Sequence, residues 1–370
     1  MSVQTMTATG NDVSRVVAEL KSQLGTHEPT AVLFFASAKY DQPALAAAME
    51  AAFEGAKVFG CTSSGEIGGD QMLKGAVVAM AIDATTAPNV AVEVIEDVSG
   101  ANDVAAAVER LGQGIGGPLG GLDVSRHVGV ILIDGMSAAE ERVMDLVGNL
   151  VDIPVVGASA GDDLAFETTH VFVGGKAHAN AAVLAILEVP AGYDILKTQS
   201  FRVLDKKLRA TQVDEVTRTV IEFDGKPAMV AYAEALGVDT GQAAKLFMNH
   251  PLGLMDGDEP YVRSPQRADG DKLVFFCNIK QGTTLSVLES ANIVEDTGAA
   301  LAEQLGPEPS IAGLINFHCI LRTLELEKRG QCGAYGALFS GLPSIGFSTY
   351  GEQYVGHVNQ TSTMLVLHNP

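Results

Sequence analysis

The chain has 370 residues, of which 47% are hydrophobic and 19% charged, which indicates a folded protein with two domains or one large repeated domain. Its formal net charge of −21 repels phosphate backbones and anionic headgroups, so we expect neither nucleic acid nor a membrane surface as a partner. No stretch reaches about 18 uninterrupted apolar residues, and the N-terminus lacks a signal-peptide pattern. Four cysteines without C-x-x-C spacing indicate reduced thiols and a cytoplasmic location.

Helical and strand patterns alternate along the first half of the chain. Asn11 is the expected N-cap of the first helix, Pro43 opens the second, and Ser137 caps a later one with Glu140 at capping-box spacing. The expected elements are helix 11–24, strand 30–38, helix 43–53, strands 57–65, 75–83 and 89–96, helix 101–111, strand 128–135, helix 137–150, and strands 153–163, 170–175 and 181–189.

The second half repeats part of this order. Strand 311–319, a helical stretch to about Leu338, strand 342–351 and strand 361–368 are expected there. Between the two halves, a strand ends at residues 224–227, a helix follows, and residues 249–265 are Pro/Gly-rich and loop-like.

Three glycine-rich turns align on their first glycine. A hydroxyl follows two residues later and an acid six residues later, in the sets Gly60, Thr62 and Glu66; Gly157, Ser159 and Asp163; and Gly346, Ser348 and Glu352. Two of the sets share a His-x-Asn before the next strand, at His178 and Asn180 and at His357 and Asn359. We therefore predict an α/β fold with mixed sheets and flanking helices, built from repeated β-α-β-β units in two pseudo-related domains.

Two sequence patterns are also found in enzymes. Residues 157–161 read G-x-S-x-G, but the nucleophile elbow of hydrolases needs a helix after the turn, and here another strand is expected. Cys61 lies at a turn rich in backbone donors, which can stabilise a thiolate, although a small buried cysteine also explains it. We expect no enzymatic activity.

Side chains that can bind a metal or a polar ligand are most concentrated in residues 316–322 and 346–360. His318, Cys319 and His357 are side chains that a heme iron accepts as axial ligands, and Arg322 and Arg202 can pair with propionates. Because strand neighbours point to opposite faces, at most one of His318 and Cys319 faces a given pocket.

These segments resemble a known family. Residues 58–69, 130–147 and 154–187 are similar to the N-terminal FIST domain, and residues 315–367 to the C-terminal FIST domain. The implied organisation is an N-terminal helical segment (1–28), a FIST N-terminal domain (29–222) and a FIST C-terminal domain (223–370). The ending "FSTYGEQ…HVNQT" and the run "CILR" resemble the NosP-like branch, which implies heme binding and nitric-oxide sensing.

The resemblance also implies a set of site residues and partners. The positions carried over from the branch are Cys319, Arg322, Gly346, Thr349, Gly351, Glu352, Gln353, Asn359, Gln360 and Thr361. No kinase, methyl-accepting or cyclase segment is recognisable in the sequence, so signalling in trans to a histidine kinase, or to a diguanylate cyclase or phosphodiesterase, is implied.

Two functions from different classes remain open at this point. The first is a heme-based sensor, with iron held by His357 or His318 in a pocket lined by Phe317, Phe347, Phe275 and Tyr350. The second is a heme-free sensor of a small polar metabolite such as an amino acid, with polar contacts from Glu352, Gln353, Asn359 and Arg322.

Overall fold

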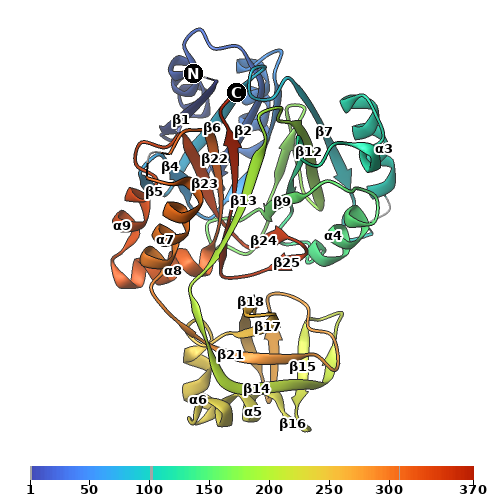
Figure 1. Ribbon diagram of the computed structural model, residues 1–370, viewed down its shortest axis with the longest axis vertical. Coiled ribbons are helices and arrows are strands. Elements are labelled where there is room, and N and C mark those ends of the chain that lie inside the picture. Colours follow the sequence, from blue (N-terminus) through green and yellow to red (C-terminus); the bar gives the residue numbers. More distant parts are fainter. Residues whose placement is uncertain (1, 101–102, 308) are drawn as a thin grey trace. The chain divides into compact units, whose positions relative to one another are not determined.

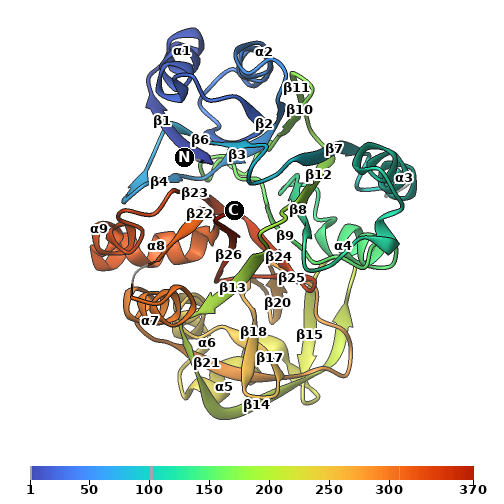
Figure 2. The same ribbon diagram turned by 45° about the horizontal axis from the view of Figure 1, so that its top comes forward.

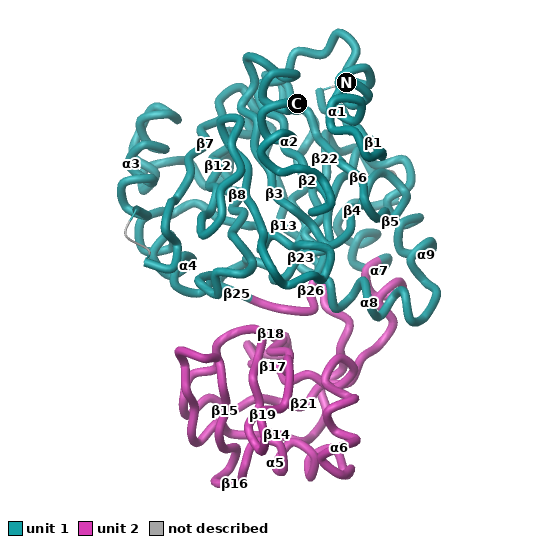
Figure 3. Tube along the Cα trace, turned by 180° about the vertical axis from the view of Figure 1, so that it is seen from behind, with its two compact units in different colours: residues 1–197, 298–357, 362–370 teal, residues 198–297, 358–361 magenta. Residues whose placement is uncertain are grey.

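A computed structural model describes residues 2–100, 103–307 and 309–370 of the chain. The chain forms two compact units (Figure 3): a larger one of residues 1–197, 298–357 and 362–370, and a smaller one of residues 198–297 and 358–361. The expected class, α/β with mixed sheets and flanking helices, is confirmed (Figure 1). The domain boundaries predicted from the sequence, after residues 28 and 222, stay a prediction. They differ from the boundaries of these compact units.

The larger unit contains three six-stranded sheets, here called A, B and C. Sheet A has the order β1-β6-β2-β3-β10-β11. Its strands are β1 (Val3–Thr9), β6 (Ala76–Asp83), β2 (Pro29–Ser37), β3 (Lys57–Ser63), β10 (Val171–Val173) and β11 (Lys176–His178). Helices α1 (Val13–Leu24) and α2 (Gln42–Ala52) cover its outer face (Figure 2).

Sheet C has the order β7-β12-β8-β9-β24-β25. Its strands are β7 (Asn89–Glu96), β12 (Ala181–Glu188), β8 (His127–Ile133), β9 (Val155–Ser159), β24 (Gly351–Tyr354) and β25 (His357–Val358). Helices α3 (Val104–Ile115) and α4 (Glu140–Gly148) cover its outer face, with the short η1 (Leu119–Gly121) beside them.

Sheet B has the order β13-β26-β22-β23-β4-β5. Its strands are β13 (Tyr193–Gln199), β26 (Thr361–His368), β22 (Ile311–Cys319), β23 (Ser344–Thr349), β4 (Glu66–Gly68) and β5 (Gln71–Leu73). Helices α8 (Ile320–Arg329) and α9 (Cys332–Ala337) connect its two parallel strands, and α7 (Ile293–Leu305) precedes them.

The three sheets share one order of strands. In each, an edge strand pairs with a long antiparallel strand, two parallel strands follow, and a short hairpin from another part of the chain completes the sheet. Hairpin β4–β5 follows β3 of sheet A but joins sheet B, β10–β11 follows β9 of sheet C but joins sheet A, and β24–β25 follows β23 of sheet B but joins sheet C. This shared topology is compatible with the predicted repeat of β-α-β-β units. The repeat in the sequence itself stays a prediction.

The three aligned glycines have a steric role in this arrangement. Each lies on the second parallel strand of its sheet, opposite Phe34, Ile131 and Asn316 respectively. A Cβ atom on Gly60, Gly157 or Gly346 would overlap the carbonyl oxygen of that partner. The glycines therefore allow close approach of the two parallel strands.

The inner faces of the three sheets meet in one core. Phe35 of sheet A packs against Phe347 and Phe317 of sheet B, with ring centroids 4.3 and 6.3 Å apart. Leu132 and Val156 of sheet C belong to the same core. These aromatic and aliphatic side chains bury the inner faces, while the helices bury the outer faces.

Several local predictions were wrong. The N-cap of α1 is Asp12, whose carboxylate accepts from the Arg15 amide, and not Asn11. Ser137 does not cap α4, because its hydroxyl donates to the Asp134 carbonyl and the helix begins only at Glu140. Residues 249–265 are not a loop but contain a β-hairpin. The expected start of a helix at residues 101–102 lies outside the described residues.

The smaller unit is an eight-stranded antiparallel sheet with short helices. Its strands run in the order β18-β17-β21-β14-β15-β20-β19, with β16 beside β15. They are β14 (Phe201–Asp214), β15 (Thr219–Phe223), β16 (Lys226–Pro227), β17 (Leu252–Asp256), β18 (Glu259–Arg263), β19 (Pro265–Asp269), β20 (Lys272–Phe275) and β21 (Thr284–Ser290), and its helices are α5 (Ala228–Leu236), α6 (Thr240–Ala243) and η2 (Ala244–Leu246). Tyr232 and Phe223 lie at the centre of its own core.

None of the helices in the described ranges combines the length and the hydropathy that a membrane span requires.

Candidate functional site

The outer face of sheet B differs from the outer faces of sheets A and C. The position held by His318 on β22 corresponds in strand register to Ala36 on β2 and Ile133 on β8. Likewise, Asn316 corresponds to Phe34 and Ile131. Two apolar positions in the other sheets are thus polar and fully buried in sheet B, which is the asymmetry expected of a functional site.

Helices α8 and α9 add further polar groups to this layer. The Asn316 amide donates to the Tyr335 hydroxyl over 3.2 Å and accepts from Ser362 Oγ over 2.7 Å. Thr323 Oγ1 and Ser348 Oγ lie 2.7 Å apart. We call Asn316, His318, Thr323, Tyr335, Ser348 and Ser362 the polar layer of sheet B.

His318 is the member of this layer whose hydrogen bonding is incomplete. Its ring is 0% exposed and lies with its centroid 4.5 Å from that of Tyr335, and neither ring nitrogen has a hydrogen-bond partner among the described residues. Burial, and after it the charge of Arg322, lowers the pKa of His318 well below its usual range. The imidazole is therefore neutral at physiological pH and keeps one lone pair for a donor or a metal.

Four other predicted residues lie close to the carboxyl edge of sheet B, on β22, on α8 and on the hairpin β24–β25 of sheet C. Cys319 ends β22 and is buried, and Arg322 on the first turn of α8 is 1% exposed. Glu352 is fully buried and accepts a short hydrogen bond from Thr349 Oγ1. His357 is 5% exposed, and its ring packs so closely on Gly351 that a Cβ there would overlap it.

Gln353 lies on β24 of sheet C and contacts β9, and Tyr350, just before β24, contacts the loop before β10. The Gln353 amide lies 3.0 Å from Ser159 Oγ. The Tyr350 hydroxyl donates to Asp162, and its ring stacks on Phe166 with centroids 5.0 Å apart. Burial, with a further contribution from Asp162, raises the pKa of Tyr350 to about 12, so it remains a donor.

The remaining predicted residues have different surroundings. Phe317 and Phe347 point into the central core, on the opposite side of sheet B from His318. Asn359, Arg202 and Phe275 belong to the smaller unit.

Sequence reasoning missed a cleft of about 340 Å³ in the larger unit, beside α8. It lies where β2 and β3 end, the edge of a sheet at which α/β proteins bind ligands. Its lining residues are Ser37, Lys39, Ser64, Lys74, Gly75, Asp163, Leu164, Ile320, Leu324 and Glu327. Two features of the sequence pointed to it, the hydroxyl-rich turn "TSSGE" and the aligned acid Asp163, but the elements that bring the other side chains together are distant in the chain.

Asp163 and Lys74 have defined partners in this cleft. The Asp163 carboxylate accepts from Ser37 Oγ over 2.7 Å and from the Ala38 amide over 3.0 Å. Lys74 forms an ion pair of 2.6 Å with Glu327 of α8. Asp163 has a φ of +55°, a conformation that costs free energy and that these bonds hold in place.

Glu66 lies behind the cleft and is 1% exposed. Its carboxylate accepts a short hydrogen bond from Ser63 Oγ and one of 2.8 Å from the Ala76 amide. Burial raises the pKa of Glu66 to about 7, the two hydrogen bonds oppose this rise, and the charge of Asp163 adds to it. Glu66 therefore titrates near physiological pH.

Neither of the two nucleophile candidates has an activated environment. Cys61 is fully buried in the central core, and burial raises the pKa of its thiol well above the usual range. Ser159 is buried at the end of β9, where turns and then β10 follow in place of a helix, and its hydroxyl donates to Glu140 over 3.1 Å.

Mixed sheets with a ligand-sized cleft at their strand ends are typical of proteins that bind small molecules. The chain belongs to the FIST family: residues 30–226 match the FIST N domain and residues 228–355 the FIST C domain. FIST domains point to a sensory role directed at small ligands.

A curated relative comes from Methanocaldococcus jannaschii and is described as "Uncharacterized protein MJ1623". It is 24% identical over an alignment of 185 residues, which covers 46% of this chain. The match spans only 36% of that relative's length.

Proposed function

We propose that this protein is a heme-free sensory input protein that binds a small zwitterion, such as an amino acid, in the cleft beside α8. The observation that carries the proposal is the composition of the cleft, which places the Lys39 ammonium, the Asp163 carboxylate and the hydroxyls of Ser37 and Ser64 around about 340 Å³. A ligand with both an amine and a carboxylate matches these groups, and this volume suits a molecule of that size.

Helix α8 provides the route for a signal. Ile320 and Leu324 line the cleft, while Thr323 of the same helix bonds to Ser348 in the polar layer of sheet B. A ligand that contacts α8 differently in two states shifts their populations by its difference in affinity. A histidine kinase or a cyclic-di-GMP enzyme acting in trans would read this shift.

The test is a thermal-shift screen of amino acids, followed by calorimetry on each hit. A specific ligand present at 100 times its Kd stabilises the native state by about 2.7 kcal/mol. Lys39→Ala should weaken binding, whereas Lys57→Ala, which removes an exposed lysine outside the cleft, should not. Equal binding by both variants, or no hit among the amino acids, contradicts the proposal.

A second candidate is a heme-based nitric-oxide sensor, and the neutral His318 with its incompletely bonded ring favours it. An imidazole nitrogen is a suitable ligand for iron, but the surroundings of the two histidines leave no room for a heme. His318 is 0% and His357 5% exposed, and Tyr335 packs on the His318 ring, so iron can reach neither side chain without displacement of the surrounding structure.

A hemin titration followed by reduction and exposure to nitric oxide separates this candidate from the first. A stoichiometric, sharp Soret band that shifts with nitric oxide and disappears in His318→Ala, but not in His357→Ala, would favour heme at His318. A broad band that is unchanged in both variants would exclude it.

A further inference from the structure

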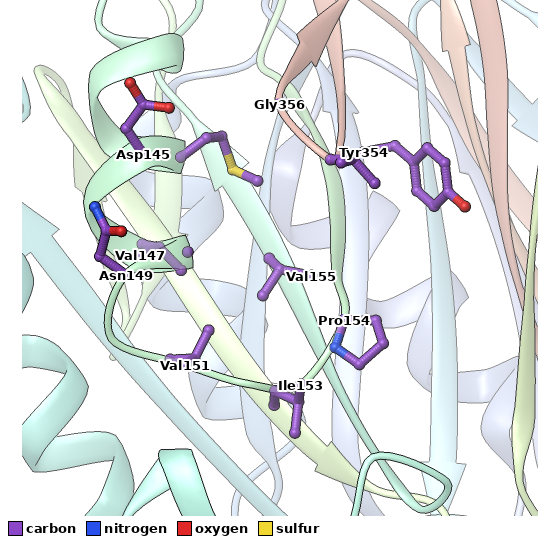
Figure 4. A pocket seen from close by; sticks show the side chains of 12 residues that line it. Asp145, Val147, Asn149, Val151, Ile153, Pro154, Val155, Tyr354 and Gly356 are labelled. Atoms are coloured by element: carbon purple, nitrogen blue, oxygen red, sulfur yellow. The ribbon is translucent and has the colours of Figure 1, made fainter. Parts of the chain in front are cut away.

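A second cavity lies in the larger unit between α4 and the hairpin β24–β25, and it measures about 490 Å³. Figure 4 shows Asp145 of α4 and Asn149, which follows the helix, on one side, the hairpin residues Tyr354 and Gly356 on the other, and Val155 between them. The full lining is Met144, Asp145, Val147, Gly148, Asn149, Val151, Ile153, Pro154, Val155, Tyr354, Val355 and Gly356. The cavity is thus mainly apolar, with Asp145 as its charged group.

The equivalent hairpins of sheets A and B pack directly on their helices. At the β10–β11 turn, a Cβ on Gly175 would lie 3.3 Å from Glu50 of α2. At the β4–β5 turn, the Asp70 carbonyl lies so close to Gly336 of α9 that a Cβ on this glycine would overlap it. At the third hairpin, β24–β25, a cavity of about 490 Å³ lies between the turn and α4.

The turn of this third hairpin also differs in its first residue. The first turn residues of the other hairpins, Gly174 and Gly69, have φ of +56° and +58°. The corresponding residue here is Val355, with φ of +52° and 81% exposure. A β-branched residue in this conformation is strained, and an exposed valine gains nothing from burial that would offset the strain. This exposed side chain also lines the cavity.

We propose that the cavity between α4 and the β24–β25 hairpin is a binding site for a small molecule with an apolar body and an amine. The floor of Val151, Ile153 and Val155 takes the apolar body, and Asp145 at the rim pairs with the ammonium. The net charge of −21 favours a cation over an anion at this surface. This site is separate from the cleft beside α8.

Occupation of this site can act on the smaller unit through the chain itself. After His357 of β25, residues 358–361 belong to the smaller unit, and the chain returns to the larger unit at Ser362. A ligand that draws the hairpin toward α4 therefore moves the strand that leads directly into this segment.

The experiment measures binding of phenethylamine by NMR titration, with 2-phenylethanol and phenylacetate as neutral and anionic probes of the same shape. We expect phenethylamine to bind with a Kd of about 1 mM or tighter, as nine non-hydrogen atoms in such a cavity permit. The alcohol should bind about two- to fivefold more weakly, since an exposed ion pair contributes this much, and the acid more weakly still. Asp145→Asn should remove the preference for the amine.

Three variants locate the site. Gly148 lines the cavity and a Cβ there meets nothing within 4 Å, so Gly148→Leu adds a large side chain at the cavity and should weaken binding at least tenfold. Gly333→Leu is the matched control, because a Cβ there also meets nothing and Gly333 lies on α9, outside the cavity lining. Val355→Gly should weaken binding without loss of stability.

Loss of amine binding in Gly148→Leu but not in Gly333→Leu supports the site. Undiminished binding in Gly148→Leu, no binding of phenethylamine to the wild-type protein, or tighter binding of phenylacetate than of phenethylamine overturns it.

Discussion

Glu66 gives the sharpest prediction, because one buried carboxyl should impose a pH dependence on the stability of the whole protein. The change to test is Glu66→Gln, which keeps the size of the side chain, an oxygen that can accept from the Ala76 amide and an NH2 group that can donate to Ser63 Oγ, but cannot ionise. An exposed glutamate provides the matched control, Glu54→Gln.

The magnitude follows from the two pKa values of Glu66. The pKa is about 7 in the folded protein and has a reference value of 4.5. The folded protein therefore binds this proton more tightly than the unfolded chain does. The corresponding stability is fully present below pH 4.5, is lost as the pH rises toward 7, and stays lost above it. At about 1.4 kcal/mol for each tenfold change, the total loss is about 3 kcal/mol.

The assay is urea unfolding of the wild-type protein, Glu66→Gln and Glu54→Gln at several pH values between 5 and 8. The free energy of unfolding of Glu66→Gln should rise relative to the wild type by about 2–3 kcal/mol across this range, whereas that of Glu54→Gln should not. A difference between Glu66→Gln and the wild type that is constant with pH would refute the assignment of a raised pKa to Glu66.

Three further predictions concern stability. Gly346→Ala should destabilise the protein by about 2–4 kcal/mol in urea unfolding, because the added Cβ overlaps the Asn316 carbonyl; Gly333→Ala, where a Cβ has open space, should stabilise it by about 0.5–1 kcal/mol, and equal effects would disprove the steric account. His318→Ile should raise the free energy of unfolding by about 1–3 kcal/mol, because it removes buried nitrogens without partners; a lower free energy of unfolding than that of the wild type would contradict this account. Asp162→Ala should cost about 2–4 kcal/mol, because its carboxylate accepts from three successive backbone amides, and a cost below 1 kcal/mol would contradict this role.

The sequence by itself determined the elements whose signal is local. Strands β7, β22 and β26 have the predicted bounds, because each is an apolar run of strand length between turn residues. The helix caps at Asn11 and Ser137 were wrong, since several neighbouring residues have capping side chains and the local pattern does not select among them.

Tertiary structure alone decided which sheet each hairpin joins, because the pattern of a short strand does not identify its partner strand. It also decided the surroundings of the site residues. His318 was a candidate from its residue type, but its buried, incompletely bonded ring results from the cover by α8 and α9. Lys39 and Asp163 are 124 residues apart in the sequence and line one cleft only because loops from sheets A and C meet beside α8. Long-range packing, and not local propensity, assembled these side chains into a site.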